Sequence, residues 1–576
     1  MANLDQERTP IALYRKRRTA LDTQFANWKP HLQDINDYIL PRARFQPLAD
    51  SINAGAKKYR AIVNNAGLQA IRTSTAGLVS GFTPPGKPWK RLTTPDPDLA
   101  EYPRVREWLH VTNERQLTMY GKSNLYQCLV AAYFDLLAFG VTLVLLDEDD
   151  ETVMRGYHAP VGSYVLACSK RGRVDTAMRD VVLTVRQLVN KFGVKTKGGL
   201  ADWSVFTDRV KNLYDKGDYD ERIEVCHVFE PNENYRPGRL TAKEKPFRSC
   251  WYEKQADDLH PVLKESGFSE NRILAPRWMV LGDDTYGTSC PGMEMLDDVK
   301  ALQSYEKEKA LIVELLGRPP TAVPHGMTKA SLMPGRIVNM PVNAQGNQQA
   351  YPLVQANPAA VKAIQEDIAA IVSRINRVSY ADLWLTLTLS PSTHQQTAEE
   401  IRAIVEEKII QIAPNLLRLN DELLDPLDDT SFEMMWRAGL IPEPPPELQG
   451  VALKTEYVSP LQVAQQYAEL GGLERLAGFV TSIIEWAPEA RLKVKVDEWL
   501  DQYVRTLGLA PSVIADDEEF GRRMDAQQKA QQAAVMQQTV ETGANAANKL
   551  ANAPTDTDNA LTRIAEATGS QGPLAA

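Results

Sequence analysis

Hydrophobic residues recur along this chain at more than one spacing, and the changes of spacing divide it into parts. Helical spacing predicts helices over residues 11–40, 57–80, 101–119 and 123–139, the last of which ends at Gly140. These four segments give the first quarter of the chain a mainly helical character.

Short runs rich in β-branched and aromatic residues follow between residues 141 and 290, as is typical of strands. The runs are VTLVLLDED, SYVLACS, TAMRDVVLT, RIEVCHVFE, RSCWYEK and RILAPRWM, and one helical pattern, VRQLVNKFG, interrupts them. Because strands and helices do not alternate regularly, the pattern gives no support to a doubly wound nucleotide-binding sheet. It predicts an α+β fold that is mainly α-helical.

The most regular helical pattern lies in the second half of the chain. Residues 293–316 are helical, and the stretch from Gly317 to Pro358 is punctuated by proline and glycine, with TAVPHG, LMPGRIVNMP and QQAYPLV as short strands and turns. The seam that follows has a period of 3.5 residues, which long helices packed side by side use. Its members are Val361, Ile364, Ile368, Ile371, Ile375 and Val378.

Loops and helical patterns alternate towards the C-terminus. SPSTHQQ predicts a loop, and TAEE begins a helix with a capping box. Helical spacing continues to about residue 510, interrupted by an extended connector at Ile441–Gly450. The stretch AQQKAQQAAVMQQ favours a helix, whereas the composition beyond about Gly543 predicts a mobile tail.

The composition is that of a globular protein with an excess of acid. The 576 residues carry a net charge of −9, and neither a run of about 18 apolar residues nor the apolar core of a signal peptide occurs, so we expect no membrane span and synthesis in a cytoplasm. The charge argues against tight nonspecific binding of DNA, but not against a protein that encloses DNA. The basic cluster Arg15–Arg18 is interpreted as a solvated helix face, with a nucleic-acid contact as the alternative.

The stretch GFTPPGKP, Gly81–Pro88, differs from a nucleotide-binding P-loop at one position. Gly81, Gly86 and Lys87 are in register with G-x-x-x-x-G-K-[ST], but Pro88 replaces the hydroxyl that would bind Mg²⁺. Three prolines also lack the backbone N–H groups that would hold phosphates. Because a helical pattern precedes the stretch, we interpret it as a loop that ends a helix.

The other reactive residues do not form a catalytic or metal-binding pattern. The five cysteines are scattered without a C-x-x-C pair, as is typical of buried thiols, and Cys226 and His227 are interpreted as strand residues. A nucleophile motif such as G-x-S-x-G does not occur. The acidic run DEDDE, Asp147–Glu151, predicts a solvated turn, with a cation site as the alternative. We therefore expect no catalytic, cofactor-binding or metal-binding residues, no cofactor and no enzymatic activity.

Four stretches occur here in the order in which one protein family has them. They are STAGLVSGFTPPGKPWKRL (Ser74–Leu92), YGTSCPG (Tyr286–Gly292) before a long helix, QQTAEEIRAIVEEK (Gln395–Lys408) and YVSPLQVAQQ (Tyr457–Gln466). Through them, residues 8–515 resemble the portal proteins, the head-to-tail connecting proteins of short-tailed bacteriophages. The resemblance implies that Lys87 is incidental to a helix-terminating loop.

The resemblance implies a structural role in a virion. Portal subunits form a ring, usually of twelve, at one vertex of the capsid, and double-stranded viral DNA enters and leaves through it without sequence-specific contacts. The implied partners are further copies of the chain, the large subunit of terminase, a tail adaptor protein, and the major capsid and scaffolding proteins. The expected location is the portal vertex of the virion, after synthesis in the host cytoplasm.

The resemblance also implies the parts of a portal fold. These are the wing at 1–290, the first stem helix at 291–317, the clip at 318–357, the second stem helix at 358–380, the tunnel loop at 381–396, a kinked helix and return to the wing at 397–459, the crown at 460–515, and a C-terminal helix that could form a barrel, with a mobile tail, at 516–576.

Three sets of candidate residues follow. The stem would pack through the seam residues given above. The clip would present an interface to motor or tail, or pack within a small β-unit or between subunits, at Met327, Leu332, Met333, Arg336 and Met340. The tunnel loop would form a polar ring around DNA, the alternative being that Thr393 and Gln396 cap the next helix; its residues are Ser390, Ser392, Thr393, His394, Gln395 and Gln396.

Two other functions stay open on the sequence alone. One is a virion structural protein without a channel, such as a tail component, and the other is a P-loop-like NTPase. Images of a closed ring with a central hole would exclude the first. ATP hydrolysis that is abolished by Lys87→Ala would support the second.

Overall fold

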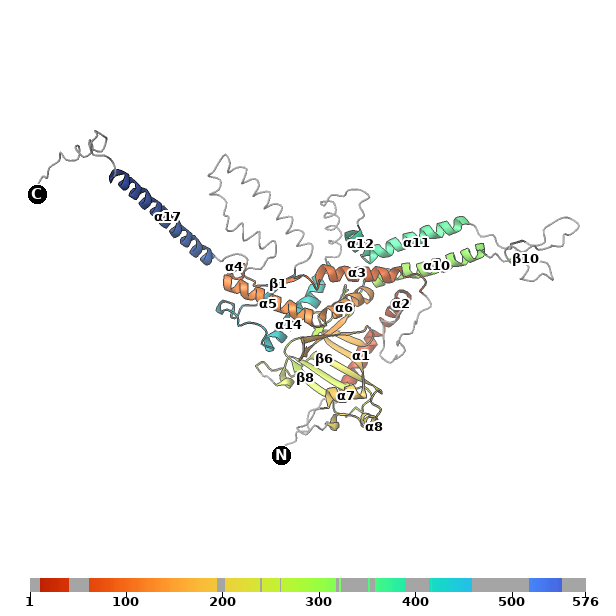
Figure 1. The fold of residues 1–576 in the computed structure, drawn as a ribbon. Helices are drawn as coiled ribbons and strands as arrows, with labels where there is room; N and C mark the ends of the chain where they lie inside the picture. Colours follow the sequence, from red (N-terminus) through yellow and green to blue (C-terminus); the bar gives the residue numbers. More distant parts are fainter. Residues whose placement is uncertain are drawn as a thin grey trace, which may run out of the picture. The chain divides into compact units, whose positions relative to one another are not determined.

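The computed structural model describes most of the chain in segments. These are residues 11–40, 62–193, 202–238, 241–258, 260–317, 321–322, 351–352, 358–389, 414–415, 417–457 and 517–551. The chain divides into two compact units, residues 1–100 with 108–468 and residues 101–107 with 469–576. Figure 1 shows the elements of both units in sequence colours.

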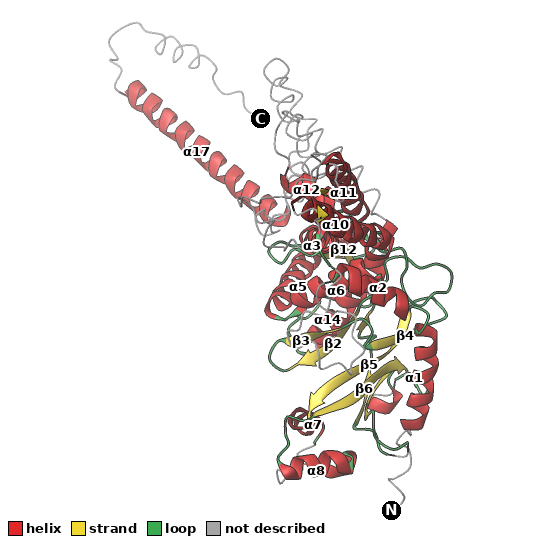
Figure 2. Ribbon diagram, turned by 90° about the vertical axis from the view of Figure 1, so that its right-hand side faces the viewer, coloured by secondary structure: helices red, strands yellow, loops and turns green. Residues whose placement is uncertain are grey.

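The largest described sheet has five antiparallel strands in the order β4-β5-β6-β7-β8. The strands span Tyr164–Cys168, Val174–Thr184, Arg222–Pro231, Phe247–Glu253 and Lys264–Phe268. Helix α1 (Ile11–Phe25) lies along one face of this sheet (Figure 2), where Tyr14 stacks on Tyr252 of β7 at 6.0 Å between ring centres. The opposite face carries α7 (Val185–Phe192) and α8 (Asp208–Lys216).

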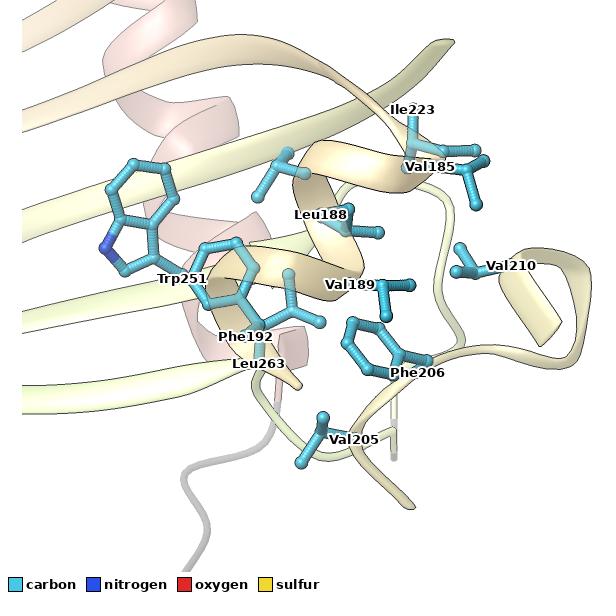
Figure 3. Packing of buried hydrophobic residues seen from close by; sticks show 11 residues of the cluster. Val185, Leu188, Val189, Phe192, Val205, Phe206, Val210, Ile223, Trp251 and Leu263 are labelled. Carbon is cyan, nitrogen blue, oxygen red and sulfur yellow. The ribbon is translucent and has the colours of Figure 1, made fainter. Parts of the chain in front are cut away.

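Helix α7 is fixed on the sheet by a cap and an apolar cluster. Thr184 and Gln187 form a capping box at its start, which satisfies two backbone N–H groups. The buried face of α7 then packs towards α8 and β7 through Val185, Leu188, Val189 and Phe192 (Figure 3). Its partners in the cluster are Val205, Phe206, Val210, Ile223, Val225, Trp251 and Leu263. The period of the buried residues is that of an amphipathic helix, as the sequence predicts.

Three smaller sheets are also antiparallel. β2 (Leu143–Asp149) pairs with β3 (Val153–Ala159) on one side and β9 (Ile273–Leu274) on the other. β1 (Lys90–Thr93) pairs with β12 (Lys454–Tyr457), and β10 (Thr321–Ala322) with β11 (Tyr351–Pro352). The described fold is therefore mixed α+β without βαβ units, which confirms the predicted class at this level.

A group of helices accounts for most of the remaining elements. Helix α6 is buried along nearly its whole length and ends at Gly140, whose φ of 77° is the left-handed conformation that glycine adopts readily. The helices of the group are α2 (Lys29–Ile39), α3 (Ala66–Phe82), α4 (Pro97–Glu101), α5 (Pro103–Lys122), α6 (Leu125–Phe139), α9 (Pro291–Glu294), α10 (Leu296–Gly317), α11 (Pro358–Val378), α12 (Ala381–Leu389) and α14 (Asp425–Arg437). A π-helical turn, Asn420–Leu424, leads into α14, and short 3₁₀ turns lie at Trp203–Val205, Ala242–Glu244 and Pro446–Leu448.

Several predicted elements differ from those found. The helix predicted over 11–40 is two helices, because the chain turns after Phe25 and Pro30 lies in the first turn of α2. The predicted second helix starts only at Ala66. Residues 381–389, predicted as part of a loop, form α12. The strands β1, β3, β8 and β12 and the helix α8 were not predicted.

The second unit is described mainly by helix α17, Asp517–Ala551. Its Gln- and Ala-rich sequence forms a helix as predicted, but the mobile tail predicted from Gly543 is wrong up to Ala551, because alanine-rich sequence continues the helix past that glycine. Met536 is 72% exposed, and Val535 and Val540 are also exposed. In the described parts of the chain, no helix combines the length and apolarity needed to cross a membrane.

Candidate functional site

The two long helices α10 and α11 lie side by side and antiparallel, joined by the segment that contains β10 and β11 (Figure 1). Ile368, Ile371 and Ile375 of the predicted seam are buried, and Val361, Ile364 and Val378 are half-buried. Beside the seam, Arg374 donates to Asp298 of α10 at 2.7 Å. The 3.5-residue period thus corresponds to a packed helix pair.

Burial of α10 decreases along its length. Leu296, Val299 and Leu302 near its start are buried, whereas Leu311, Val313 and Leu316 near its end are 56%, 52% and 38% exposed. We call these last three residues the exposed hairpin end. The apolar side chains near the end of α10 are therefore more exposed than those near its start.

The loop Gly81–Pro88 ends helix α3, as the sequence predicts. The backbone N–H of Thr83 donates to Val79, and Lys87 is exposed in the turn that follows. A helix, not a strand, precedes the loop, so the order of elements differs from that of a P-loop. A different lysine, Lys90, is buried three residues further on and forms an ion pair inside the fold.

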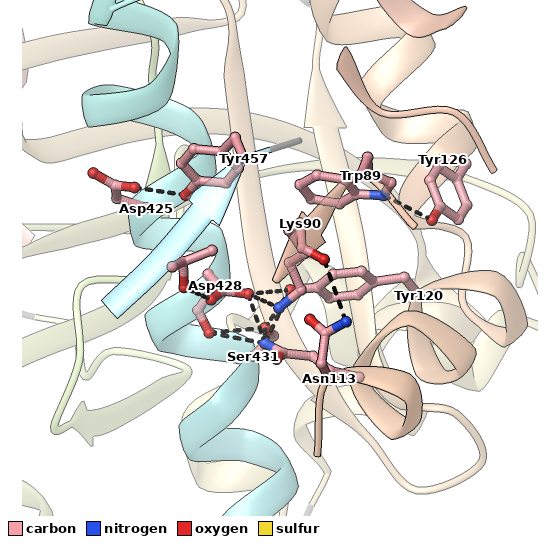
Figure 4. Close-up of polar contacts among 11 residues, drawn as sticks. Trp89, Lys90, Asn113, Tyr120, Tyr126, Asp425, Asp428, Ser431 and Tyr457 are labelled. Atoms are coloured by element: carbon pink, nitrogen blue, oxygen red, sulfur yellow. Dashed lines mark hydrogen bonds and ion pairs between the residues drawn. The ribbon is translucent and has the colours of Figure 1, made fainter. Parts of the chain in front are cut away.

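Lys90 lies in β1 and is buried with Asp428 of α14 (Figure 4). The Asp428 carboxylate also accepts hydrogen bonds from Gln116 at 2.8 Å, from Tyr120 at 3.1 Å and from Thr455 of β12. Burial lowers the pKa of the Lys90 ammonium and raises the pKa of the Tyr120 hydroxyl. One carboxylate therefore joins β1, α5, α14 and β12.

Aromatic rings cover the same junction. Trp89 stacks between Tyr120 at 6.0 Å and Tyr457 at 6.3 Å, and its Nε1 donates to Tyr126 at 3.2 Å. The Tyr457 hydroxyl donates to Asp425, whose pKa is raised chiefly by burial. Sequence reasoning missed this network, although the stretches Ser74–Leu92 and Tyr457–Gln466 contained three of its residues.

Glycines in the recognised stretches allow close packing. A Cβ on Gly77 would lie 2.0 Å from the Trp384 side chain of α12. In YGTSCPG, a Cβ on Gly287 would lie 2.0 Å from the Gly140 carbonyl oxygen, and one on Gly292 would lie 2.1 Å from that of Ala138. A larger residue would require the Trp384 ring to move at Gly77, and the backbone to move at Gly287 and Gly292.

A second buried ion pair fixes the π-helical turn. Arg277, which follows β9, donates to Glu422 through Nη2 at 2.6 Å and Nε at 3.2 Å, and its backbone N–H donates to the same carboxylate at 2.9 Å. Arg418 adds a further bond at 2.9 Å. π-Helical turns are rare, and these contacts connect this one to the segment that follows β9.

The basic cluster Arg15–Arg18 differs from both interpretations made from the sequence. Arg15 pairs with Asp258, Arg17 with Glu230, and Arg18 with Asp180 and Asp22. Arg17 and Arg18 therefore connect α1 to strands of the sheet and Arg15 connects it to the turn after β7, while Lys16 and Arg17 are the exposed members of the cluster.

The acidic run Asp147–Glu151 forms a turn, as predicted, only at Asp150 and Glu151, because its first three residues end strand β2 and pair with β3. Asp147 and Glu148 accept hydrogen bonds from Arg272 at 3.2 and 2.6 Å, and Thr152 lowers the pKa of Asp149 by donating to it. Within the described residues, no group of three His, Cys, Asp or Glu side chains could hold a metal ion. Cys226 and His227 lie in β6, and four of the five free cysteines are buried.

Two predicted sets of site residues lie outside the described residues. They are the clip set, Met327, Leu332, Met333, Arg336 and Met340, and the tunnel-loop set, Ser390, Ser392, Thr393, His394, Gln395 and Gln396. Both sets stay predictions.

The family model and the related proteins that match this chain indicate the same family. The family model described as "Bacteriophage head to tail connecting protein" matches residues 12–514. The portal protein of Salmonella phage epsilon15 is 37% identical over 559 residues, covering 96% of this chain and 98% of the relative. The probable portal protein of Bordetella phage BPP-1 is 34% identical over 570 residues, covering 97% and 99%.

Solved structures were compared as well. The neck of an empty gene transfer agent particle is similar with a TM-score of 0.34 and 11% identity, over 72% of this chain and 87% of that chain. The family match spans most of the chain, and both relatives are matched over nearly their whole length. The chain therefore belongs to the family of bacteriophage head-to-tail connecting proteins, the portal proteins, which are structural components of the virion at the junction of head and tail and not enzymes.

Proposed function

We propose that copies of this chain assemble into a closed ring, of about twelve, at one vertex of the capsid, and that viral DNA passes through the ring during packaging and ejection. The observation that carries this proposal is the 37% identity to the portal protein of phage epsilon15 over 98% of that protein. The exposed hairpin end supports it, because a neighbouring copy in a ring would cover exposed apolar side chains such as Leu311.

Within this proposal, α10 and α11 are the stem helices, and residues 318–357 between them are the clip. The sheets other than β10–β11 and the helices before α10 form the wing, residues 460–515 form the crown, and the tunnel loop begins after α12. The double-stranded DNA contacts polar side chains of that loop, and the acid excess of the chain limits its affinity for phosphates.

The clip is the proposed docking surface for the large subunit of terminase and then for a tail adaptor protein. The major capsid and scaffolding proteins are proposed partners of the wing. Charged substitutions of Met333 and Met340 should block attachment of motor and adaptor and leave the ring intact. If both attachments survive these substitutions, the clip is wrongly assigned.

Native mass spectrometry of the purified full chain tests the ring. The expected result is one dominant species whose mass is an integer multiple of 64.3 kDa. A chain that stays monomeric, or that gives an open series of masses, would contradict the proposal. Deletion of Ser392–Gln395 should keep the ring but reduce packaged or retained DNA.

A further inference from the structure

A row of side chains crosses the five-stranded sheet on the face that carries α7. The register pairs Arg179 of β5 with His227 of β6, His227 with Trp251 of β7, and Trp251 with Lys264 of β8. Directly paired residues of antiparallel strands point to the same face, so these four lie in one line. Helix α7 adds Lys191, whose Nζ lies 4.1 Å from the centre of a Trp251 ring.

Arg179 is the buried cation of this row, with 8% of its surface exposed. Its Nε donates to Nδ1 of His227 at 3.2 Å, and the guanidinium lies 5.6 Å from the ring of Tyr157 and 5.7 Å from that of Trp251. Because Nδ1 of His227 accepts this bond, Nε2 is the protonated nitrogen of a neutral ring and donates to Ser249 at 2.8 Å. The imidazole therefore does not neutralise the guanidinium.

No carboxylate of the described segments forms an ion pair with Arg179, Lys191 or Lys264. Asp147, the acid that acts on Arg179 from a distance, accepts a hydrogen bond from Arg272 instead. On the opposite face of the sheet, the similarly buried Arg18 has both Asp180 and Asp22 as partners. Burial without such a partner lowers the pKa of Arg179 to about 10, and a buried unpaired cation destabilises the folded chain.

We propose that Arg179, Lys191 and Lys264 form an oxyanion site that receives a carboxylate side chain of a second copy of this chain. The inference rests on the proposed ring, in which every copy has a neighbour. The planar guanidinium binds carboxylates with two parallel hydrogen bonds. The chain supplies such groups in excess, with 74 acidic against 65 basic residues.

The surroundings of Arg179 are those of a protein interface and not of a nucleic-acid groove. Tyr157 is 40% exposed, and Lys191 and Lys264 are exposed, so a buried arginine has an aromatic and polar rim, as interface hot spots do. Asp147 and Glu148 are about half exposed on the neighbouring hairpin. Asp147 and Glu148 would repel the row of phosphates of a nucleic acid. A single carboxylate side chain carries one charge and can bind Arg179 without contacting these two acids.

Arg179→Met in the full chain tests the site through stability and assembly. The melting temperature of the dilute, unassembled chain should fall less than that of Arg18→Met, because removal of a buried unpaired charge offsets the lost hydrogen bond to His227. The protein concentration for half-assembly, measured by mass photometry, should rise at least about tenfold. The matched control Arg18→Met should lower the melting temperature, because it leaves the buried Asp180 with only the more exposed Lys254 as a partner.

Three results would overturn the inference. If the wild type assembles and Arg179→Met assembles at the same concentration, the site is not at an interface between copies. If excess inorganic phosphate at constant ionic strength raises the melting temperature of the wild type but not of Arg179→Met, without a change in assembly by the variant, the occupant is a free oxyanion. A wild-type chain that never assembles would overturn the proposed ring and this site together.

Discussion

Lys90 and Asp428 illustrate how single residues join distant parts of this chain. The two residues are 338 positions apart, and both side chains are nearly inaccessible to water. Replacing Lys90 with methionine leaves the Asp428 carboxylate buried without its cation. We expect Lys90→Met to reduce the free energy of unfolding by about 3–5 kcal/mol in urea denaturation.

The neighbouring Arg91 is the matched control for that substitution. It pairs with Glu456 on the surface, with side chains 61% and 45% exposed. Because exposed pairs contribute about 0–1 kcal/mol, Arg91→Met should change the free energy of unfolding little. Equal effects of the two substitutions would show that the buried pair does not stabilise the junction.

His227 gives the fold a dependence on pH. Burial, and then Arg179 and Lys191, hold its pKa well below 6.5. The unfolded chain therefore binds one more proton than the folded chain below about pH 6.5, so this residue lowers stability as the pH falls, by about 1.4 kcal/mol per pH unit. In urea denaturation between pH 7 and pH 5, His227→Gln should show a correspondingly shallower loss. An unchanged slope would contradict the neutral, buried imidazole.

At the residue scale, the sequence identified few of the groups that hold this fold. Lys87 belongs to a stretch that resembles a motif, but it is not the lysine that stabilises the fold. Lys90 belongs to no motif and forms a buried ion pair with Asp428 of α14. The sequence pattern predicted a solvated face for Arg15, Arg17 and Arg18, because Asp258, Glu230 and Asp180, with which they pair, are more than 150 residues away in the sequence. Pairings of this kind depend on tertiary contacts and leave no local pattern.

At the scale of elements, the seam of α11 offers the sharpest test of packing. Ile371 is 4% exposed, and the adjacent Ala370 is exposed on the same helix. Ile371→Asp would bury an unpaired carboxylate and should cost about 4 kcal/mol of stability or abolish soluble protein. Ala370→Asp carries the same charge and should cost at most about 0.7 kcal/mol, the difference in helix propensity.

Thermal unfolding of the two variants and the wild type measures this difference. If Ile371→Asp has the same melting temperature as Ala370→Asp, the helix pair is not packed through the seam. Sequence patterns predict structure best at this scale for a physical reason: α6, α7 and α11 carry periodic apolar residues, and the local sequence encodes this periodicity.

Other elements left no such signal. β1 and β12 have four residues each and exist because they pair with one another across more than 350 positions. Helix α12 was predicted as loop from the family division, although Gly77 and Gly81 of α3 provide the space for its Trp384. Short elements of this kind are stabilised by packing and not by local propensity.

At the scale of the whole molecule, the four recognised stretches indicated the family, which no single residue did. Two of them meet at β1 and β12, and the glycines of YGTSCPG lie against the end of α6. The described residues of Ser74–Leu92 and Tyr286–Gly292 therefore serve backbone packing, which gives these two stretches a structural reason for their sequence. The clip and tunnel-loop residues stay predictions.

Electron microscopy of the purified full chain tests the central claim most directly. If copies of this chain form the conduit between head and tail, class averages should show closed rings with a central hole wide enough for duplex DNA. Closed particles without a hole, or open chains of subunits, would contradict the account.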